Sequence, residues 1–190
     1  PGRTPVKTSV LSSERREDII AQVNFACQSG RQAYWVCTLI NESETLECEA
    51  AEKVSSELKE KLPKVSIGLV HGGLTSQEKN RRMQEFKKGN LDLLVCTTVI
   101  EVGVDVPNAS LMIIENSERL GLAQLHQLRG RVGRGSEASH CLLLYKKPLG
   151  AISRQRLDVM RTSNDGFFIA EKDLEMRGPG EIFGTLQSGE

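Results

Sequence analysis

Short apolar runs alternate along this chain with longer segments in which apolar residues recur at helical spacing. The runs are rich in β-branched and aliphatic side chains, which is typical of strands buried on both faces of a sheet. The first run follows a proline-containing linker and indicates an edge strand, whereas the second reads as a central strand. These apolar runs lie at residues 6–11, 32–40, 65–70, 91–96, 111–114 and 140–145.

The intervening segments predict helices at 14–29, 44–61 and 122–129, and another that begins at Thr75. Thr75 and Glu78 have the spacing of a capping box, and glycines follow the ends of two of these helices. Regular alternation of strand and helix predicts an α/β fold, with a parallel sheet, right-handed crossovers and helices on both faces.

The pattern changes after residue 145. Residues 152–162 and 167–176 predict two helices, and residues 177–189 contain four glycines and one proline, which indicates a shaped loop. We therefore expect a sheet domain with an N-terminal linker over residues 1–146, and a helical hairpin with a glycine-rich loop over residues 147–190. The glycine-rich end also suggests a piece of a longer protein.

Composition narrows the class of protein. The 25 basic residues balance the 25 acidic ones, so a nucleic-acid surface would have to be a local patch. There is no signal peptide and no apolar run long enough to span a bilayer, which predicts a cytoplasmic protein without a membrane partner. Five cysteines without a Cys-x-x-Cys pair indicate buried thiols in a reducing compartment, and not a metal site or disulfides.

The chemistry concentrates between residues 91 and 134. Arg129, Arg131 and Arg134 stand among glycines, which allow close approach to a ligand, and guanidinium groups suit phosphate oxygens. Arg131 and Arg134 are three residues apart, so on a helical turn both side chains would point the same way. Surface salt bridges are the alternative interpretation of any one of these arginines.

Only half of a phosphoryl-transfer site is present in the sequence. There is no G-x-x-x-x-G-K-[ST] loop and no obvious acidic pair for magnesium. An arginine supplied to a γ-phosphate across an interface can contribute ~10³–10⁵ in rate. The sequence therefore predicts that these arginines complete a nucleotide-binding site that lies mainly on another domain.

Three segments carry a family resemblance. QLRGRVGR and TTVIEVGVDVPNA resemble the sixth and fifth motifs of superfamily two helicases, and VHGGLTSQEKNRRMQEFKKG resembles a segment that precedes them. The resemblance implies a RecA-like fold, as in the second motor domain of such enzymes, over residues 32–145. GLAQLHQLRGRVGR and DLEMRGPGEIFGTLQSG are most similar to the bacterial branch-migration helicases, and the transcription-repair coupling translocases are the near alternative.

The resemblance implies roles for individual residues. Arg131 and Arg134 would meet the γ-phosphate of ATP with Gln127 beside them, while Asp105 would lie near the nucleotide sugar and Gly103 would let its loop approach. ATP and Mg²⁺ would be held mainly by a first motor domain that this sequence lacks, so the chain alone would be inactive as an ATPase.

Further residues are assigned to DNA and to movement. Thr97 would touch the nucleic-acid backbone and His71 and Gly72 would border the same track, although Thr97 could simply cap a turn and His71 could be a satisfied loop histidine. Because strand ends share one edge of a parallel sheet, Thr97, His71 and the segment after Ile114 should meet there. The resemblance also assigns coupling of ATP turnover to movement to residues of the hairpin and loop, namely Arg156, Arg177 and Gln187.

The function implied is ATP-driven remodelling of branched double-stranded DNA, such as stalled forks and Holliday junctions, in recombination and repair. The partners implied are DNA, the first RecA-like domain and an upstream DNA-binding wedge domain, in a nucleoid-associated protein. A coupling translocase, or a nucleic-acid-binding module without motor activity, are the alternatives. If the chain were such a binding module, Arg131 and Arg134 would affect only nucleic-acid affinity and its salt dependence. For the hairpin, the alternative interpretation is a helical cap that covers an edge of the sheet.

Overall fold

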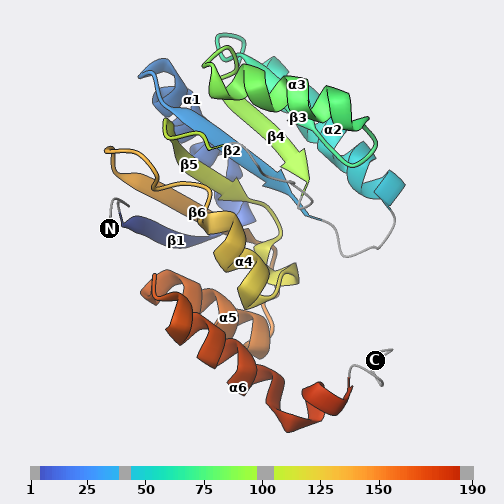
Figure 1. Cartoon of the computed structure of the whole chain (residues 1–190), viewed down its shortest axis with the longest axis vertical. Helices are drawn as coiled ribbons and strands as arrows, with labels where there is room; N and C mark the ends of the chain where they lie inside the picture. Colours follow the sequence, from blue (N-terminus) through green and yellow to red (C-terminus); the bar gives the residue numbers. More distant parts are fainter. Residues whose placement is uncertain (1–4, 39–43, 98–104, 185–190) are drawn as a thin grey trace.

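The computed structural model describes residues 5–38, 44–97 and 105–184. Within these residues six parallel strands form one sheet in the order β1-β6-β5-β2-β4-β3, so β1 and β3 are its edges (Figure 1). The predicted parallel α/β architecture is confirmed, and so is the placement of the first strand at an edge. The strands are β1 Val6–Ser12, β2 Gln32–Cys37, β3 Ile67–Val70, β4 Leu93–Thr97, β5 Ala109–Ile114 and β6 Ser139–Tyr145.

Helices cover both faces of this sheet, in two separate apolar clusters. The first two long helices pack on one face, and the remaining helices contribute to the cluster on the other (Figure 1). The helical elements are η1 Ser13–Arg15, α1 Arg16–Gln28, α2 Glu44–Lys61, α3 Ser76–Lys87, η2 Ser117–Arg119, α4 Leu122–Arg129, α5 Ala151–Thr162 and α6 Gly166–Gly184.

The central strand β2 shows why the sequence runs are continuously apolar. All six of its residues are buried, and consecutive side chains point to opposite faces. Tyr34 packs edge-on against Phe86 of α3, with 5.1 Å between ring centroids. Trp35 belongs to the opposite cluster, where the guanidinium of Arg16 lies 5.3 Å from its ring centroid.

Local signals read from the sequence are confirmed at the helix ends. The Thr75 hydroxyl accepts from the Glu78 amide at 3.1 Å, and the Glu78 carboxylate accepts from the Thr75 amide at 3.2 Å. Gly30 and Gly89 follow α1 and α3 with φ of 91° and 87°, a region that L side chains avoid. The cysteines are free thiols, and four of the five are buried.

The end of the second hairpin helix was predicted wrongly. The sequence placed its last residue at 176 and a loop from 177, but helical backbone continues to Gly184, and Figure 1 shows the last turns bending away. A proline removes one helical hydrogen bond and kinks a helix without necessarily ending it, so Pro179 and its neighbouring glycines did not stop this one. The expected loop residues beyond Gly184, including Gln187, lie outside the described residues.

Candidate functional site

The residues after α4 form a tight turn, which we call the arginine turn (residues 130–135). The Arg131 amide donates to the Leu128 carbonyl at 3.0 Å, which continues the helical winding for one step. Gly133 then has a φ of 83° and reverses the chain before Arg134. The expectation that Arg131 and Arg134 share a helical turn is therefore wrong, because a left-handed glycine separates them.

Arg134 folds back over this turn. Its Nε donates to the Gly130 carbonyl at 3.0 Å, and a terminal nitrogen lies 3.2 Å from the Asp105 carboxylate. Both side chains are substantially exposed, so this ion pair adds little stability. It does bring together two residues that the resemblance placed at the nucleotide. Gly103, which the resemblance also placed at the nucleotide, lies outside the described residues.

Arg131 has a different environment. Its side chain is partly buried and makes no hydrogen bond or ion pair within the described part of the chain. Burial lowers the pKa of this guanidinium, the neighbouring Tyr34 hydroxyl opposes that shift, and the positive charge of Arg134 adds to it. A partly desolvated cation beside a second cation, without an acid of its own, favours binding of an anion.

Close backbone packing holds the arginine turn in place. A Cβ added to Gly135 would lie 2.4 Å from the Pro107 carbonyl oxygen, so no larger residue fits there without movement. Pro107 lies two residues before the start of β5, which places this end of the turn by the amino end of that strand. Gln127 is exposed on α4, one turn before Arg131.

A second group of predicted residues lies at the carboxyl edge of the sheet. Thr97 ends β4 beside Cys37 of β2, and its side chain is only 2% exposed. His71 follows β3, accepts from the Gly73 amide at 3.0 Å through Nδ1, and has Nε2 3.6 Å from Glu52. His71 therefore has the contacts of a satisfied loop histidine, with Gly72 in the turn beside it.

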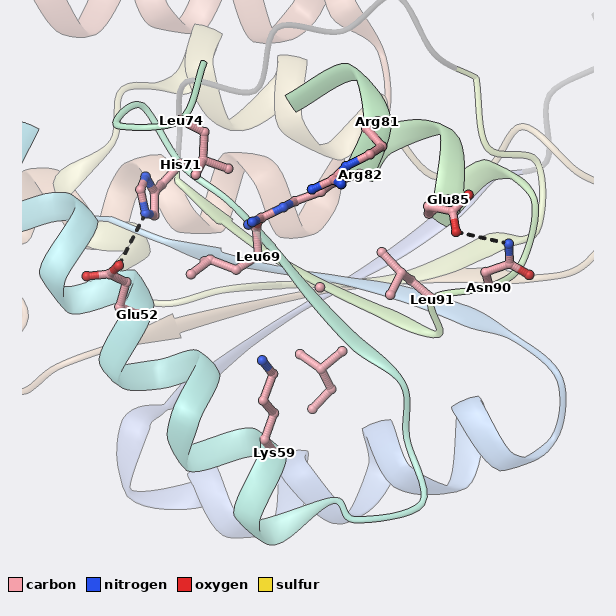
Figure 2. Close-up of a pocket in the computed structure, with 12 residues that line it drawn as sticks. Glu52, Lys59, Leu69, His71, Leu74, Arg81, Arg82, Glu85, Asn90 and Leu91 are labelled. Carbon is pink, nitrogen blue, oxygen red and sulfur yellow. Dashed lines mark hydrogen bonds and ion pairs between the residues drawn. The ribbon is translucent and has the colours of Figure 1, made fainter. Parts of the chain in front are cut away.

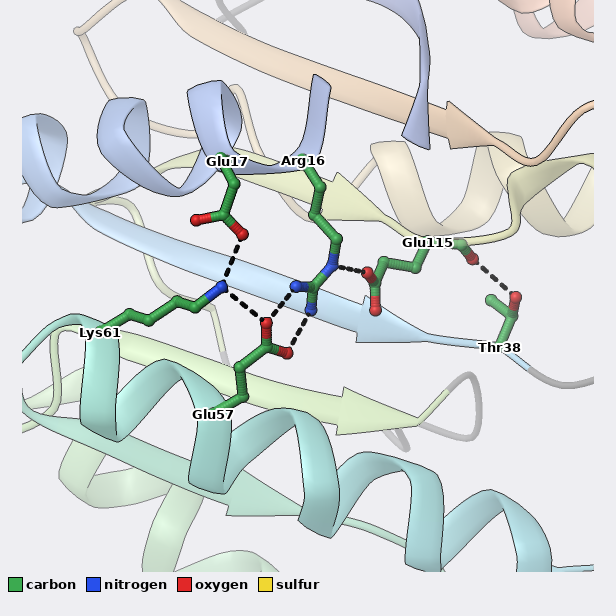
Figure 3. A network of polar contacts seen from close by, with 6 residues as sticks. All are labelled: Arg16, Glu17, Thr38, Glu57, Lys61 and Glu115. Atoms are coloured by element: carbon green, nitrogen blue, oxygen red, sulfur yellow. Dashed lines mark hydrogen bonds and ion pairs between the residues drawn. The ribbon is translucent and has the colours of Figure 1, made fainter. Parts of the chain in front are cut away.

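A charged network at the same edge was not foreseen from the sequence (Figure 3). Arg16 of α1 bonds Glu57 of α2 through both terminal nitrogens, and its Nε lies 2.5 Å from Glu115, just after β5. These hydrogen bonds lower the pKa of Glu57. Thr38 donates to the Glu115 carbonyl at 2.6 Å. The network thus fixes the chain where it leaves β5, and it joins segments too distant in sequence for any local pattern to reveal.

Arg129 was grouped with the phosphate-facing arginines by the sequence, but it points into the protein. It is 3% exposed and donates to the Met160 carbonyl of α5 at 2.7 Å and to the Thr8 hydroxyl of β1 at 3.2 Å. A terminal nitrogen also lies 3.3 Å from Nδ1 of His126. Arg129 therefore ties the helix that leads into the arginine turn to the hairpin.

The hairpin has a second attachment through Arg156. One terminal nitrogen of Arg156 donates to the Glu118 carbonyl in η2 at 2.9 Å and to the Ser153 hydroxyl at 3.2 Å. Its buried Nε has no hydrogen-bond partner among the residues that the structure describes. Arg177 on α6 instead pairs with Asp173 one turn earlier, at 3.1 Å. Arg156 is thus placed to connect α5 with the segment that follows β5.

Neither metal-ligand clusters nor long apolar helices were found in the described ranges. No three or more His, Cys, Asp or Glu side chains gather there in a way that could hold a metal ion. No helix of the same residues is long and apolar enough to cross a membrane.

Comparison with known proteins decides the family. The model of the helicase conserved C-terminal domain matches residues 14–136, most of the sheet domain. The chain belongs to this family. A second model, for the C-terminal part of domain 3 of the ATP-dependent DNA helicase RecG, matches residues 163–190 of this helicase domain.

Relatives agree over the whole chain. The helicase domain is 65% identical over 190 residues to the ATP-dependent DNA helicase RecG of Pasteurella multocida and 66% identical to that of Escherichia coli K12. Each of these alignments covers all of this chain but only 27% of the length of the relative, so the chain spans about a quarter of either protein. A solved structure of RecG bound to a three-way DNA junction superimposes with a TM-score of 0.81 at 44% identity, over 96% of this chain and 24% of that one. The expected RecA-like helicase fold is confirmed.

Proposed function

We propose that this chain is the second motor domain of an ATP-dependent DNA helicase that remodels branched duplex DNA, such as stalled forks and Holliday junctions. The observation that carries the proposal is the guanidinium of Arg131, which is partly buried beside Arg134 and has no hydrogen bond or ion pair with any residue that the structure describes. Similarity to RecG over the full chain supports the choice of DNA and of branched substrates.

In this proposal the nucleotide lies between this domain and a first RecA-like domain. ATP supplies the γ-phosphate, and Mg²⁺ would be bound mainly by that other domain. Arg131 and Arg134 would bind the phosphate oxygens, and Asp105 would hold Arg134 in position until the anion takes over part of its contacts. Gln127 and Gly103 would border the same nucleotide.

Thr97, His71 and Gly72 would contact DNA at the carboxyl edge of the sheet. Thr97 is 2% exposed, so contact with a phosphate would require the adjoining segment to move. We further propose a division into a motor unit at residues 1–146 and a coupling unit at residues 147–190. An upstream wedge domain would bind the junction, and the protein would work in the cytoplasm in association with the nucleoid.

The coupling unit would convert nucleotide-driven closure into movement on duplex DNA. Arg156 attaches α5 to the segment after β5, and Arg129 attaches α5 to the arginine turn. Two attachments from one helix to two parts of the motor unit would transmit a change at the arginine turn to the hairpin. Arg177 and Gln187 would act further along the same unit.

The test is DNA-stimulated ATP hydrolysis. The chain alone should hydrolyse no ATP above background, and in a protein that joins it to a motor domain with a phosphate loop, Arg131→Ala or Arg134→Ala should lower turnover ~10³-fold or more with DNA affinity nearly unchanged. Arg154→Ala, an exposed arginine of α5, is the matched control. Hydrolysis by the chain alone, or an effect only on DNA affinity and its salt dependence, would favour a binding module instead.

A further inference from the structure

The outer edge of β3 presents backbone groups that no strand of the described structure pairs. The Ser66 carbonyl accepts from the Asp92 amide at 2.8 Å and from the Leu93 amide at 3.1 Å, so Ser66 faces β4. Because backbone groups alternate in direction along a parallel strand, Ile67 and Leu69 point theirs away from the sheet. The Leu69 carbonyl does so, since Arg82 of α3 donates to it at 2.6 Å.

A cleft of about 780 Å³ runs along this edge, between α2 and α3 (Figure 2). Its volume is in the range of pockets that bind ligands in other proteins. The side chains of Ile67 and Leu69 are only half buried there, so the cleft joins apolar surface to backbone groups that pair with no described strand. Such an edge is a template for another strand unless it is covered or blunted.

The charges of the cleft are unequally satisfied. Glu52 faces His71 at 3.6 Å, and Glu85 accepts from Asn90 at 3.2 Å (Figure 2). Glu85 also lies 3.9 Å from the ammonium of Lys88. Lys59 of α2 makes no hydrogen bond or ion pair with any described residue, and Arg81 of α3 is attracted electrostatically by Glu78 on its own helix. Three cations, Lys59, Arg81 and Arg82, line the cleft with two carboxylates, Glu52 and Glu85, so its formal charge is positive, with cations on both walls.

We propose that the β3 edge binds an extended protein segment with adjacent acidic side chains, which pairs with the outward groups of Ile67 and Leu69. Neighbouring side chains of a strand point to opposite faces, so one carboxylate would reach Lys59 on the α2 side and the next would reach Arg81 on the α3 side. In the unbound chain Arg82 donates to the Leu69 carbonyl, and this hydrogen bond is replaced by one from the backbone of the bound segment.

The geometry favours a peptide over a nucleic acid. A peptide strand offers both donors and acceptors at the spacing of β3, whereas a phosphate backbone offers acceptors alone. Ile67, Leu69 and Leu91 also line the cleft, and these apolar side chains suit aliphatic side chains of the bound segment. This inference is independent of the proposed motor function, since it uses neither the arginine turn nor the hairpin.

The test uses a fluorescein-labelled peptide of seven residues, with two adjacent glutamates flanked by valines and threonines, titrated into the full chain by fluorescence anisotropy. We expect a Kd on the order of 10–100 μM at low salt, about tenfold weaker binding with either Lys59→Glu or Arg81→Glu, and about tenfold weaker binding when glutamine replaces the glutamates. Lys53→Glu on α2 and Lys87→Glu on α3, exposed lysines outside the cleft, should have less than about a twofold effect.

Two further measurements decide the mode of binding. N-methylation of the peptide backbone should abolish binding, and hydrogen exchange at the Ile67 and Leu69 amides should slow when the peptide is bound. Absence of binding at 1 mM peptide, or tolerance of N-methylation, would overturn the proposal. So would displacement of the peptide by a single-stranded oligonucleotide at equal or lower concentration, which would assign the cleft to nucleic acid.

Discussion

Arg129 illustrates how a buried charge is stabilised without an acidic partner. Its hydrogen-bond acceptors within the described residues are the Met160 carbonyl, the Thr8 hydroxyl and a ring nitrogen of His126, and burial lowers its pKa. Met160 lies in the last turn of α5, and Arg129 is itself the last residue of α4. The negative ends of two helix dipoles therefore lie at one guanidinium.

This arrangement predicts a large effect of substitution. Arg129→Met would leave the Met160 carbonyl and the Thr8 hydroxyl buried without their donor, and should lower the free energy of unfolding by about 2–4 kcal/mol. Chemical denaturation of the two proteins measures the difference. Arg154→Met, at an exposed position of α5, should change it by less than about 0.5 kcal/mol. Equal effects at both positions would show that the hydrogen bonds of Arg129 to α5 and β1 do not stabilise the fold.

At the scale of single residues, the sequence identified chemistry more reliably than geometry. Motif spacing singled out Arg131, Arg134 and Asp105, and the structure does pair the last two. The sequence could not show that Gly133 adopts positive φ, or that Arg129 turns inward, because both depend on elements distant in the chain. The Arg16 network could not be predicted for the same reason, since α1, α2 and the segment after β5 meet only in the folded sheet.

Elements were predicted well where local signals define their ends. α2 and α4 have the predicted bounds, and Thr75 and Glu78 close the start of α3 as expected. The error at α6 arose where glycine and proline compete with helical winding, which composition alone does not resolve.

The capping box of α3 allows a quantitative test. α3 has few apolar residues, with Met83 and Phe86 its buried ones, so its first turn depends strongly on the cap. Thr75→Ala should lower the free energy of unfolding by about 1 kcal/mol, whereas Ser76→Ala, one residue further, should have little effect. Thermal and urea denaturation would show this. A loss below about 0.3 kcal/mol would mean that tertiary contacts alone hold the helix start.

The hairpin helix α5 supports a prediction about coupling. Arg156→Ala removes the bond to the Glu118 carbonyl but leaves the Arg129 link to the same helix intact. In a protein with both motor domains, ATP hydrolysis should remain within about threefold of wild type, while fork unwinding should fall about tenfold or more. Both rates should be measured on one preparation. A parallel loss of the two would place Arg156 in the nucleotide site or in folding.

For the whole molecule, the buried thiols predict a loss of stability in alkali. Burial raises the pKa of both Cys27 and Cys141 to about 12, from a value near 9 when exposed. The unfolded chain therefore releases these protons first, and the free energy of unfolding should decrease as pH rises from about 9 to 12. Urea denaturation at pH 8, 9 and 10 measures the decrease, and Cys27→Ala with Cys141→Ala should reduce its slope. An unchanged slope would exclude these thiols as the cause.

The position of β1 orders events during synthesis. Val6 pairs with Ser139 and Ser12 with Tyr145, so the first of the six described strands to be synthesised has its strand partner in the last of them. At ordinary rates of translation the wait is on the order of ten seconds. The strands between them can associate meanwhile, because β2 already has β4 and β5 as neighbours. Pairing of β1 is thus the step that completes the six-stranded sheet, and whatever is joined to β1 becomes fixed to the sheet only then.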